Sequence, residues 1–120
     1  ALPIFNAEYD APMGDTIKIT NLIQQVLEVV REYFSIELDE QSLSYERFIT
    51  HLRFLAQRVF TGEHMNLDNL EFQEVIDRLY PEEYACSQKI QALIKLQYRH
   101  QVTEEEVAYL ALHIKRIRTK

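Results

Sequence analysis

Residues 42–60 read SLSYERFITHLRFLAQRVF, a stretch without glycine or proline, so nothing in it interrupts a helix. Its apolar side chains recur at the spacing of one helix face: Phe48, Leu52, Leu55, Ala56 and Val59. This stripe predicts a helix that packs against a core. His51 lies beside the stripe, one turn from Arg47 and two turns from Arg58. A histidine on a basic strip is suited to hold an anion such as a phosphoryl group; a half-buried structural histidine is the alternative interpretation.

The composition is that of a globular domain. The chain has 120 residues, 47% of them hydrophobic and 27% charged, and its two glycines and three prolines predict long elements with few turns. The net charge of −6 argues against nucleic acid as a ligand of this segment itself. Cys86 is the only cysteine and cannot form a disulfide within the chain, which favours a reducing, cytoplasmic location. The sequence contains no long apolar run, so we expect no membrane span.

The hydrophobic pattern predicts an all-α fold, a compact bundle of five helices. We expect helices at about 16–35, 42–60, 69–80 and 81–100, and a last one that follows a cap at Thr103. Asp39 or Ser42 would cap the second helix, Asp68 or Asn69 would cap the third, and Pro81 would separate the third from the fourth. The third helix would bury a stripe made of Phe72, Val75, Ile76 and Leu79.

The first residues are expected to lie outside this bundle. We interpret 1–15 as a linker, the tail of a preceding domain or a cloning remnant, with a turn at 11–15, and 16–120 as the domain. Because the chain does not begin with methionine, we expect it to be an excised domain.

The last helix has the clearest start in the chain. Thr103 and Glu106 have the spacing of a capping box, and the acidic first turn and basic last turn both suit the helix dipole. Its buried stripe is predicted to be Val107, Leu110, Ala111, Ile114 and Ile117. His113 lies at the border of this stripe, with Tyr109 at i−4 and Arg116 at i+3. Taken alone, a histidine in such a position is more often structural than functional.

The other histidines and motifs do not indicate an enzyme. His64 falls in a polar loop around Gly62 and is expected to be solvated, whereas His100 at the end of the fourth helix would carry a favourable charge there. No histidine or cysteine pair has metal-ligand spacing, and no glycine-rich phosphate loop or nucleophile motif occurs. We therefore predict no metal site, no cofactor and no catalytic residue.

Two runs of residues resemble a known family. Residues 43–54, followed by Ala56-Gln57-Arg58, are similar to the signature helix of the PTS regulation domain (PRD), most closely the second PRD of BglG/LicT-type transcription antiterminators. Residues 106–116 resemble the second signature of the same domain. In that family, the histidines at the positions of His51 and His113 accept phosphate from the sugar phosphotransferase system. The resemblance extends over residues 16–118.

This resemblance implies a five-helix regulatory domain that forms homodimers in the cytoplasm. The phosphoryl donor would be HPr, the phosphocarrier of the phosphotransferase system, and possibly also a sugar-specific enzyme II. RNA would be bound only by a separate N-terminal domain, absent here. Arg47, Arg58 and Arg116 lie within two turns of a histidine and are predicted to support the phosphoryl groups. Two alternatives are a PRD of a DNA-binding transcriptional activator and a dimerisation scaffold whose histidines stay unphosphorylated.

Overall fold

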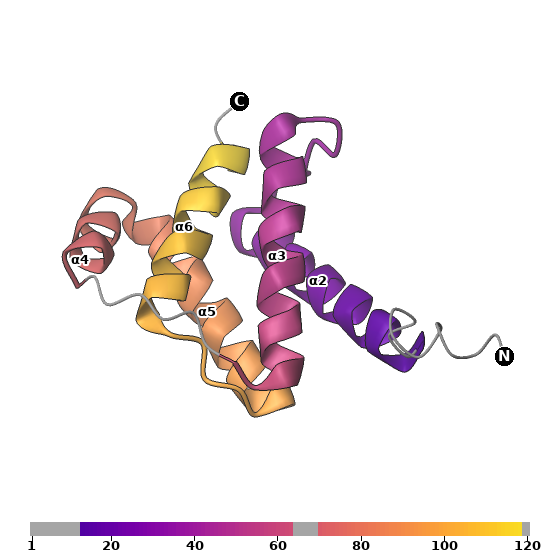
Figure 1. Cartoon of the computed structure of the whole chain (residues 1–120). Helices are drawn as coiled ribbons and strands as arrows, with labels where there is room; N and C mark the ends of the chain where they lie inside the picture. Colours follow the sequence, from indigo (N-terminus) through magenta and orange to yellow (C-terminus); the bar gives the residue numbers. More distant parts are fainter. Residues whose placement is uncertain (1–12, 64–69, 119–120) are drawn as a thin grey trace, which may run out of the picture.

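The structure is a computed structural model, and it describes residues 13–63 and 70–118. Those ranges contain five α-helices and no strand, which confirms the predicted all-α fold (Figure 1). The helices are α2 (Met13–Phe34), α3 (Leu43–Thr61), α4 (Leu70–Leu79), α5 (Pro81–Tyr98) and α6 (Glu104–Arg118). None of the described helices is long and apolar enough to cross a membrane.

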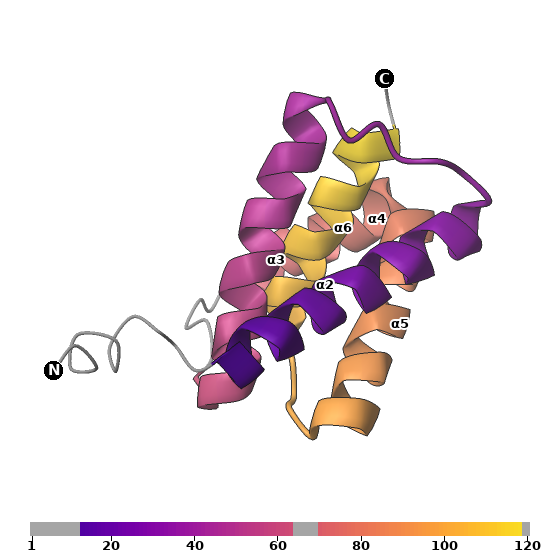
Figure 2. The same ribbon diagram turned by 90° about the vertical axis from the view of Figure 1, so that its right-hand side faces the viewer.

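Helix α6 contacts three other helices, α3, α4 and α5. It runs antiparallel to α3 on one side and to α5 on the other, and α4 stands beside it (Figure 1). Figure 2 shows α2 running diagonally across the layer formed by α3, α6 and α5, and α2 contacts both α3 and α5. The two signature helices of the sequence, α3 and α6, are therefore direct neighbours.

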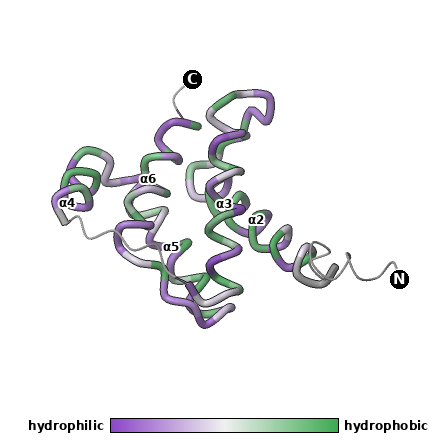
Figure 3. Tube along the Cα trace, in the orientation of Figure 1, coloured by the Kyte–Doolittle hydropathy of each residue, from purple (hydrophilic) through white to green (hydrophobic). Residues whose placement is uncertain are grey.

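The core lies where these helices face one another. The predicted stripe of α3 is buried, with Phe48 and Ala56 at 0% exposure, and so is the predicted stripe of α6. Figure 3 shows hydrophobic and hydrophilic segments following each other along α2 and α3, as expected for helices with one buried face. Burial of one face against a shared core holds each helix in place more than its own propensity does.

Residues that the sequence predicted cap the starts of α3 and α6, and a glycine ends α3. Ser42 is the N-cap of α3, and its Oγ accepts a hydrogen bond from the Tyr45 N–H at 3.1 Å. Gly62 ends α3 at φ 82°, where its N–H donates to the Arg58 carbonyl oxygen at 2.8 Å. The capping box of α6 is present: the Glu106 N–H donates to Thr103 Oγ1 at 3.3 Å.

Helices α5 and α6 form a hairpin joined by the turn at 99–103. The Ser87 hydroxyl on α5 donates a hydrogen bond to the Val107 carbonyl oxygen of α6 at 2.6 Å, and the Gln91 amide donates to the Val102 carbonyl oxygen at 2.8 Å. At the far end of the hairpin, the Arg118 guanidinium pairs with Glu83 on α5. These contacts tie α5 to α6 and to the connection between them.

Two expectations about helix ends and one about burial were wrong. Helix α2 begins at Met13, so residues 13–15 of the predicted turn are helical; a glycine in the first turn costs only about 1 kcal/mol, which the apolar stripe that follows outweighs. Val75 and Leu79 are exposed, at 37% and 58%, because none of the described helices covers that side of α4. Helix α5 ends at Tyr98 and not at about His100, and the His100 side chain just beyond it is buried, at 6% exposure. His64 and the predicted cap of α4 lie outside the described residues.

Candidate functional site

The two histidines singled out by the sequence lie against each other. His51 comes from α3 and His113 from α6, and their ring centroids are 4.8 Å apart with 29° between the ring planes. Each residue lies at the border of its helix's buried stripe, so packing α3 against α6 brings the two borders together. Both side chains are half-buried.

These two rings belong to an aromatic row of five rings, which consists of Phe48, His113, His51, Tyr109 and Phe72. Phe48 stacks on His113 with centroids 5.9 Å apart, and Tyr109 lies 6.4 Å from His51. Phe72 from α4 extends the row, 4.6 Å from Tyr109. The row fixes the orientation of both imidazoles, because each is held between two other rings.

The surroundings of His51 keep its imidazole neutral. Burial, then the neighbouring His113, then Arg58 lower the pKa of His51 from 6.5 to about 4. Its Nε2 atom is buried and has no hydrogen-bond partner among the described residues. At neutral pH this ring therefore carries no charge.

His113 is shifted in the same direction. Burial lowers the pKa of His113, and Arg116 and Arg47 lower it further. A neutral imidazole has a lone pair on one ring nitrogen, so it is a nucleophile, whereas an imidazolium is not. Two adjacent neutral imidazoles with arginines nearby can accept an electrophilic group that brings negative charge, such as a phosphoryl group.

The arginines do not all act on the histidine that helical spacing predicts. Arg58 acts on His51, but Arg47, although one turn from His51 on α3, acts on His113 across the helix interface. Both Arg47 and Arg116 are exposed. Helical spacing describes neighbours on one helix only, so it could not show that Arg47 reaches the histidine of α6.

Sequence reasoning also missed the partner of Arg58. The Arg58 Nε donates to Oε2 of Glu106 at 2.6 Å, and the Glu106 side chain is 0% exposed. The Nη2 atom of Arg58 is buried without a hydrogen-bond partner within the described ranges. The sequence pattern assigned Glu106 only to the capping box. The one signal of a further role is that residues 47–60 of α3 carry arginines and no acid, so an acidic partner has to come from another helix.

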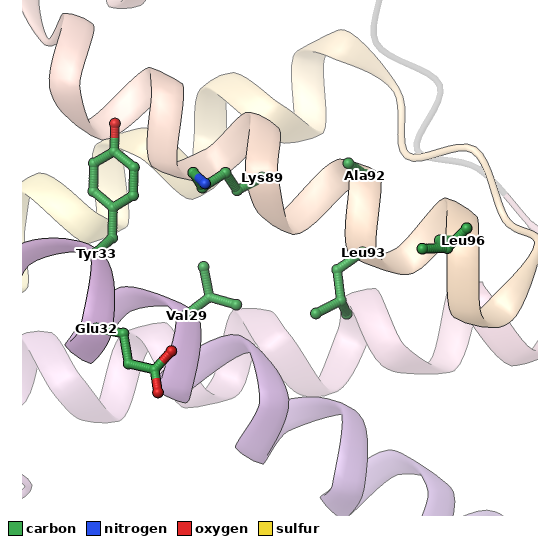
Figure 4. A pocket seen from close by; sticks show the side chains of 7 residues that line it. All are labelled: Val29, Glu32, Tyr33, Lys89, Ala92, Leu93 and Leu96. Atoms are coloured by element: carbon green, nitrogen blue, oxygen red, sulfur yellow. The ribbon is translucent and has the colours of Figure 1, made fainter.

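Other polar and apolar features lie away from this site. Across the described parts of the chain, no three histidine, cysteine or acidic side chains come together as a metal would require. Cys86 is buried, and burial raises the pKa of its thiol to about 12, which makes it unreactive. A groove of about 530 Å³ between α2 and α5 is lined by neither histidine (Figure 4). Its lining residues are Val29, Glu32, Tyr33, Lys89, Ala92, Leu93 and Leu96.

Comparison with known proteins agrees with the sequence resemblance. Residues 24–117 match the family model of the PRD domain. The chain is 42% identical over 117 residues to the transcription antiterminator LicT of Bacillus subtilis, which covers 98% of this chain and 42% of that protein. It is 36% identical over 120 residues to the beta-glucoside operon antiterminator of Dickeya chrysanthemi, covering 100% of this chain and 42% of the relative. Protein GlcT of Staphylococcus aureus (strain Newman) is 32% identical over 114 residues, 95% of this chain and 40% of that protein. The chain thus spans less than half the length of these relatives.

Proposed function

We propose that this chain, which belongs to the PRD domain family, is the regulatory domain of a bacterial transcription antiterminator. We further propose that His51 and His113 are its phospho-acceptors. The observation that carries this proposal is the stack of two neutral imidazoles, 4.8 Å apart, with three arginines around them. A structural role needs only one hydrogen bond for each ring, and it does not account for a buried Nε2 atom of His51 that has no partner in the described structure.

The chemistry is the transfer of a phosphoryl group between histidines. A lone pair on the acceptor imidazole attacks the phosphorus of a phosphohistidine on the donor protein, and the donor's P–N bond breaks as the new P–N bond forms. The electron pair of the broken bond stays on the donor imidazole. That imidazole takes up a proton, while the acceptor releases the proton of its other ring nitrogen to solvent. The domain is then a substrate of the transfer and needs no cofactor or metal of its own.

The donor that fits this chemistry is HPr, with a sugar-specific enzyme II as a second candidate. A phosphoryl group adds about −1.5 to −2 charges by analogy with other phosphorylated residues. Arg47 and Arg116 can offer charge-assisted hydrogen bonds to a phosphoryl group on His113, and Arg58 can do so for His51. The added charge would control homodimerisation in the cytoplasm, and through it RNA binding by a separate domain of the antiterminator.

Labelling by phosphorylated HPr tests this function. The wild-type chain should acquire phosphate on histidine, and the double variant His51→Ala, His113→Ala should stay helical by circular dichroism yet acquire none. His64→Ala is the matched control, since it removes a histidine that matches no family motif, and its labelling should equal that of the wild type. Undiminished labelling of the double variant would refute the acceptor assignment. No labelling of the wild type would favour the dimerisation scaffold instead.

A further inference from the structure

The carboxylate of Glu106 bridges two parts of the site. Its Oε1 accepts a hydrogen bond from the Thr103 N–H at 3.4 Å, which caps α6, and its Oε2 accepts from Arg58 Nε at 2.6 Å. The side chain is fully buried. A buried charge pair of this kind is costly to break, because separating the partners leaves an uncompensated charge. Glu106 therefore fixes the position of the Arg58 guanidinium on the α6 side of the interface.

The two histidines consequently differ in how ready they are to accept a phosphoryl group. Nε2 of His51 is enclosed, and the arginine beside it is already bound to a carboxylate. The arginines of His113, Arg47 and Arg116, are exposed and make no salt bridge to any described residue. An incoming phosphoryl group thus finds available cations at His113. At His51 it must first gain access, and Glu106 already holds the Arg58 guanidinium through Nε, although the buried Nη2 atom has no hydrogen-bond partner among the described residues.

We propose that Glu106 is a positioning residue that withholds Arg58 from His51, so that His113 accepts its phosphoryl group before His51 does. The inference rests on the proposed function and adds an order to it. At each histidine the donor's P–N bond breaks as the bond to the acceptor nitrogen forms, and the acceptor's other ring proton passes through solvent to the donor imidazole. Modification of His51 then requires α3 and α6 to separate locally, and the phosphoryl group replaces the carboxylate of Glu106 as the partner of Arg58.

The distance between the rings reinforces this order. With centroids 4.8 Å apart, phosphoryl groups on both histidines would place two dianionic groups close together. Like charges at such separations repel strongly where water is partly excluded. Once His113 is modified, the second transfer therefore becomes slower unless α3 moves away and Arg58 is released.

A time course of labelling, read separately at each histidine, tests the order. The chain is incubated with phosphorylated HPr, quenched at alkaline pH, and His51 and His113 are quantified by mass spectrometry. We expect His113 to be labelled at least about tenfold faster, because an opening equilibrium of about 0.1 already reduces the reactive fraction of His51 tenfold.

The variant Glu106→Gln tests the role of the carboxylate. A glutamine keeps an oxygen for the Thr103 N–H, since capping boxes accept Glu or Gln, but it removes the charge that holds Arg58. Labelling of His51 should accelerate at least about threefold, because the Arg58 guanidinium beside it is released. Labelling of His113 should stay within about twofold, because Glu106 does not hold the arginines of that site. Glu104→Gln is the matched control, because it removes an exposed charge from the same turn of α6 and should change neither rate.

The labelling rates decide whether the proposed order and the proposed role of Glu106 are correct. Equal rates in the wild type, or faster labelling of His51, would overturn the proposed order. An unchanged or slower His51 in a folded Glu106→Gln variant would show that Glu106 does not withhold Arg58. If that variant does not fold, the order in the wild type alone supports or overturns the proposal. Absence of label on both histidines is a different result, since it refutes the proposed function itself.

Discussion

Acidification should destabilise this domain through His51. The folded protein lowers the pKa of this imidazole from 6.5 to about 4, mainly by burial. The unfolded chain therefore binds more protons than the folded one once the pH falls below 6.5, and stability declines as the pH approaches 4. The difference between the unfolded and folded pKa, about 2.5 units at about 1.36 kcal/mol each, corresponds to a maximum loss of about 3.4 kcal/mol. At pH 5 the unfolded chain is almost fully protonated at this site and the folded one is not, which gives about 2 kcal/mol.

Urea unfolding followed by circular dichroism, at about pH 8 and about pH 5, measures this loss directly. His51→Gln is the control, because glutamine is polar and helix-compatible but does not titrate. The free energy of unfolding of the wild type should fall by about 2 kcal/mol more than that of the variant. Burial lowers the pKa of His113 in the same direction, so the double glutamine variant should lose still less. Equal losses in the wild type and in His51→Gln would refute the claim that the fold holds this imidazole neutral.

Three further outcomes follow from other contacts. Arg58→Ala should destabilise the domain by about 3–5 kcal/mol in urea unfolding, because it leaves the buried Glu106 without its partner. The control Arg53→Ala, at an exposed position of the same helix, should change the free energy of unfolding by no more than about 0.5 kcal/mol. Equal effects of the two substitutions would show that the buried pair does not stabilise the fold. Gly62→Ala should cost about 1 kcal/mol, because the residue sits at φ 82° with open space around it, and an unchanged melting temperature would show that the left-handed cap is unimportant. Phosphorylation should tighten the proposed homodimer in sedimentation across a dilution series, and Arg47→Ala should weaken this effect by removing a cation beside His113. Looser association of the phosphorylated wild type would mean that charge repulsion dominates.

Local features of the fold were predictable from the sequence, because they depend on residues within a turn or two of each other. The stripe of α3, the serine cap at Ser42 and the capping box at Thr103 are all of this kind, and the structure confirms them. Periodicity identifies the apolar face of a helix but not whether another helix covers it. For this reason Val75 and Leu79 were assigned to the core although they are exposed.

The arrangement of the site depends instead on how α3 and α6 pack. The stacking of His51 on His113 is set by the register between two helices far apart in the chain, which single-helix spacing does not contain. The pairing of Arg58 with Glu106 is hidden for the same reason, since the two residues are 48 positions apart. Family resemblance selected the two histidines, and the structure brings them together, whereas their role as phospho-acceptors stays a prediction.

The hairpin of α5 and α6 determines which part of the domain can open alone. Its helices are joined by a short turn and linked by the Ser87 hydroxyl, so closing it costs little chain entropy and its amide hydrogens should be the last to exchange with deuterium. Helix α3 reaches α6 only across a long stretch of intervening chain, and its amides should exchange through a smaller, local opening. The platform that carries His113 can therefore persist while the helix that carries His51 detaches. Phosphorylation would then change the fraction of molecules in which α3 has separated from the hairpin, and it would leave the rest of the fold intact.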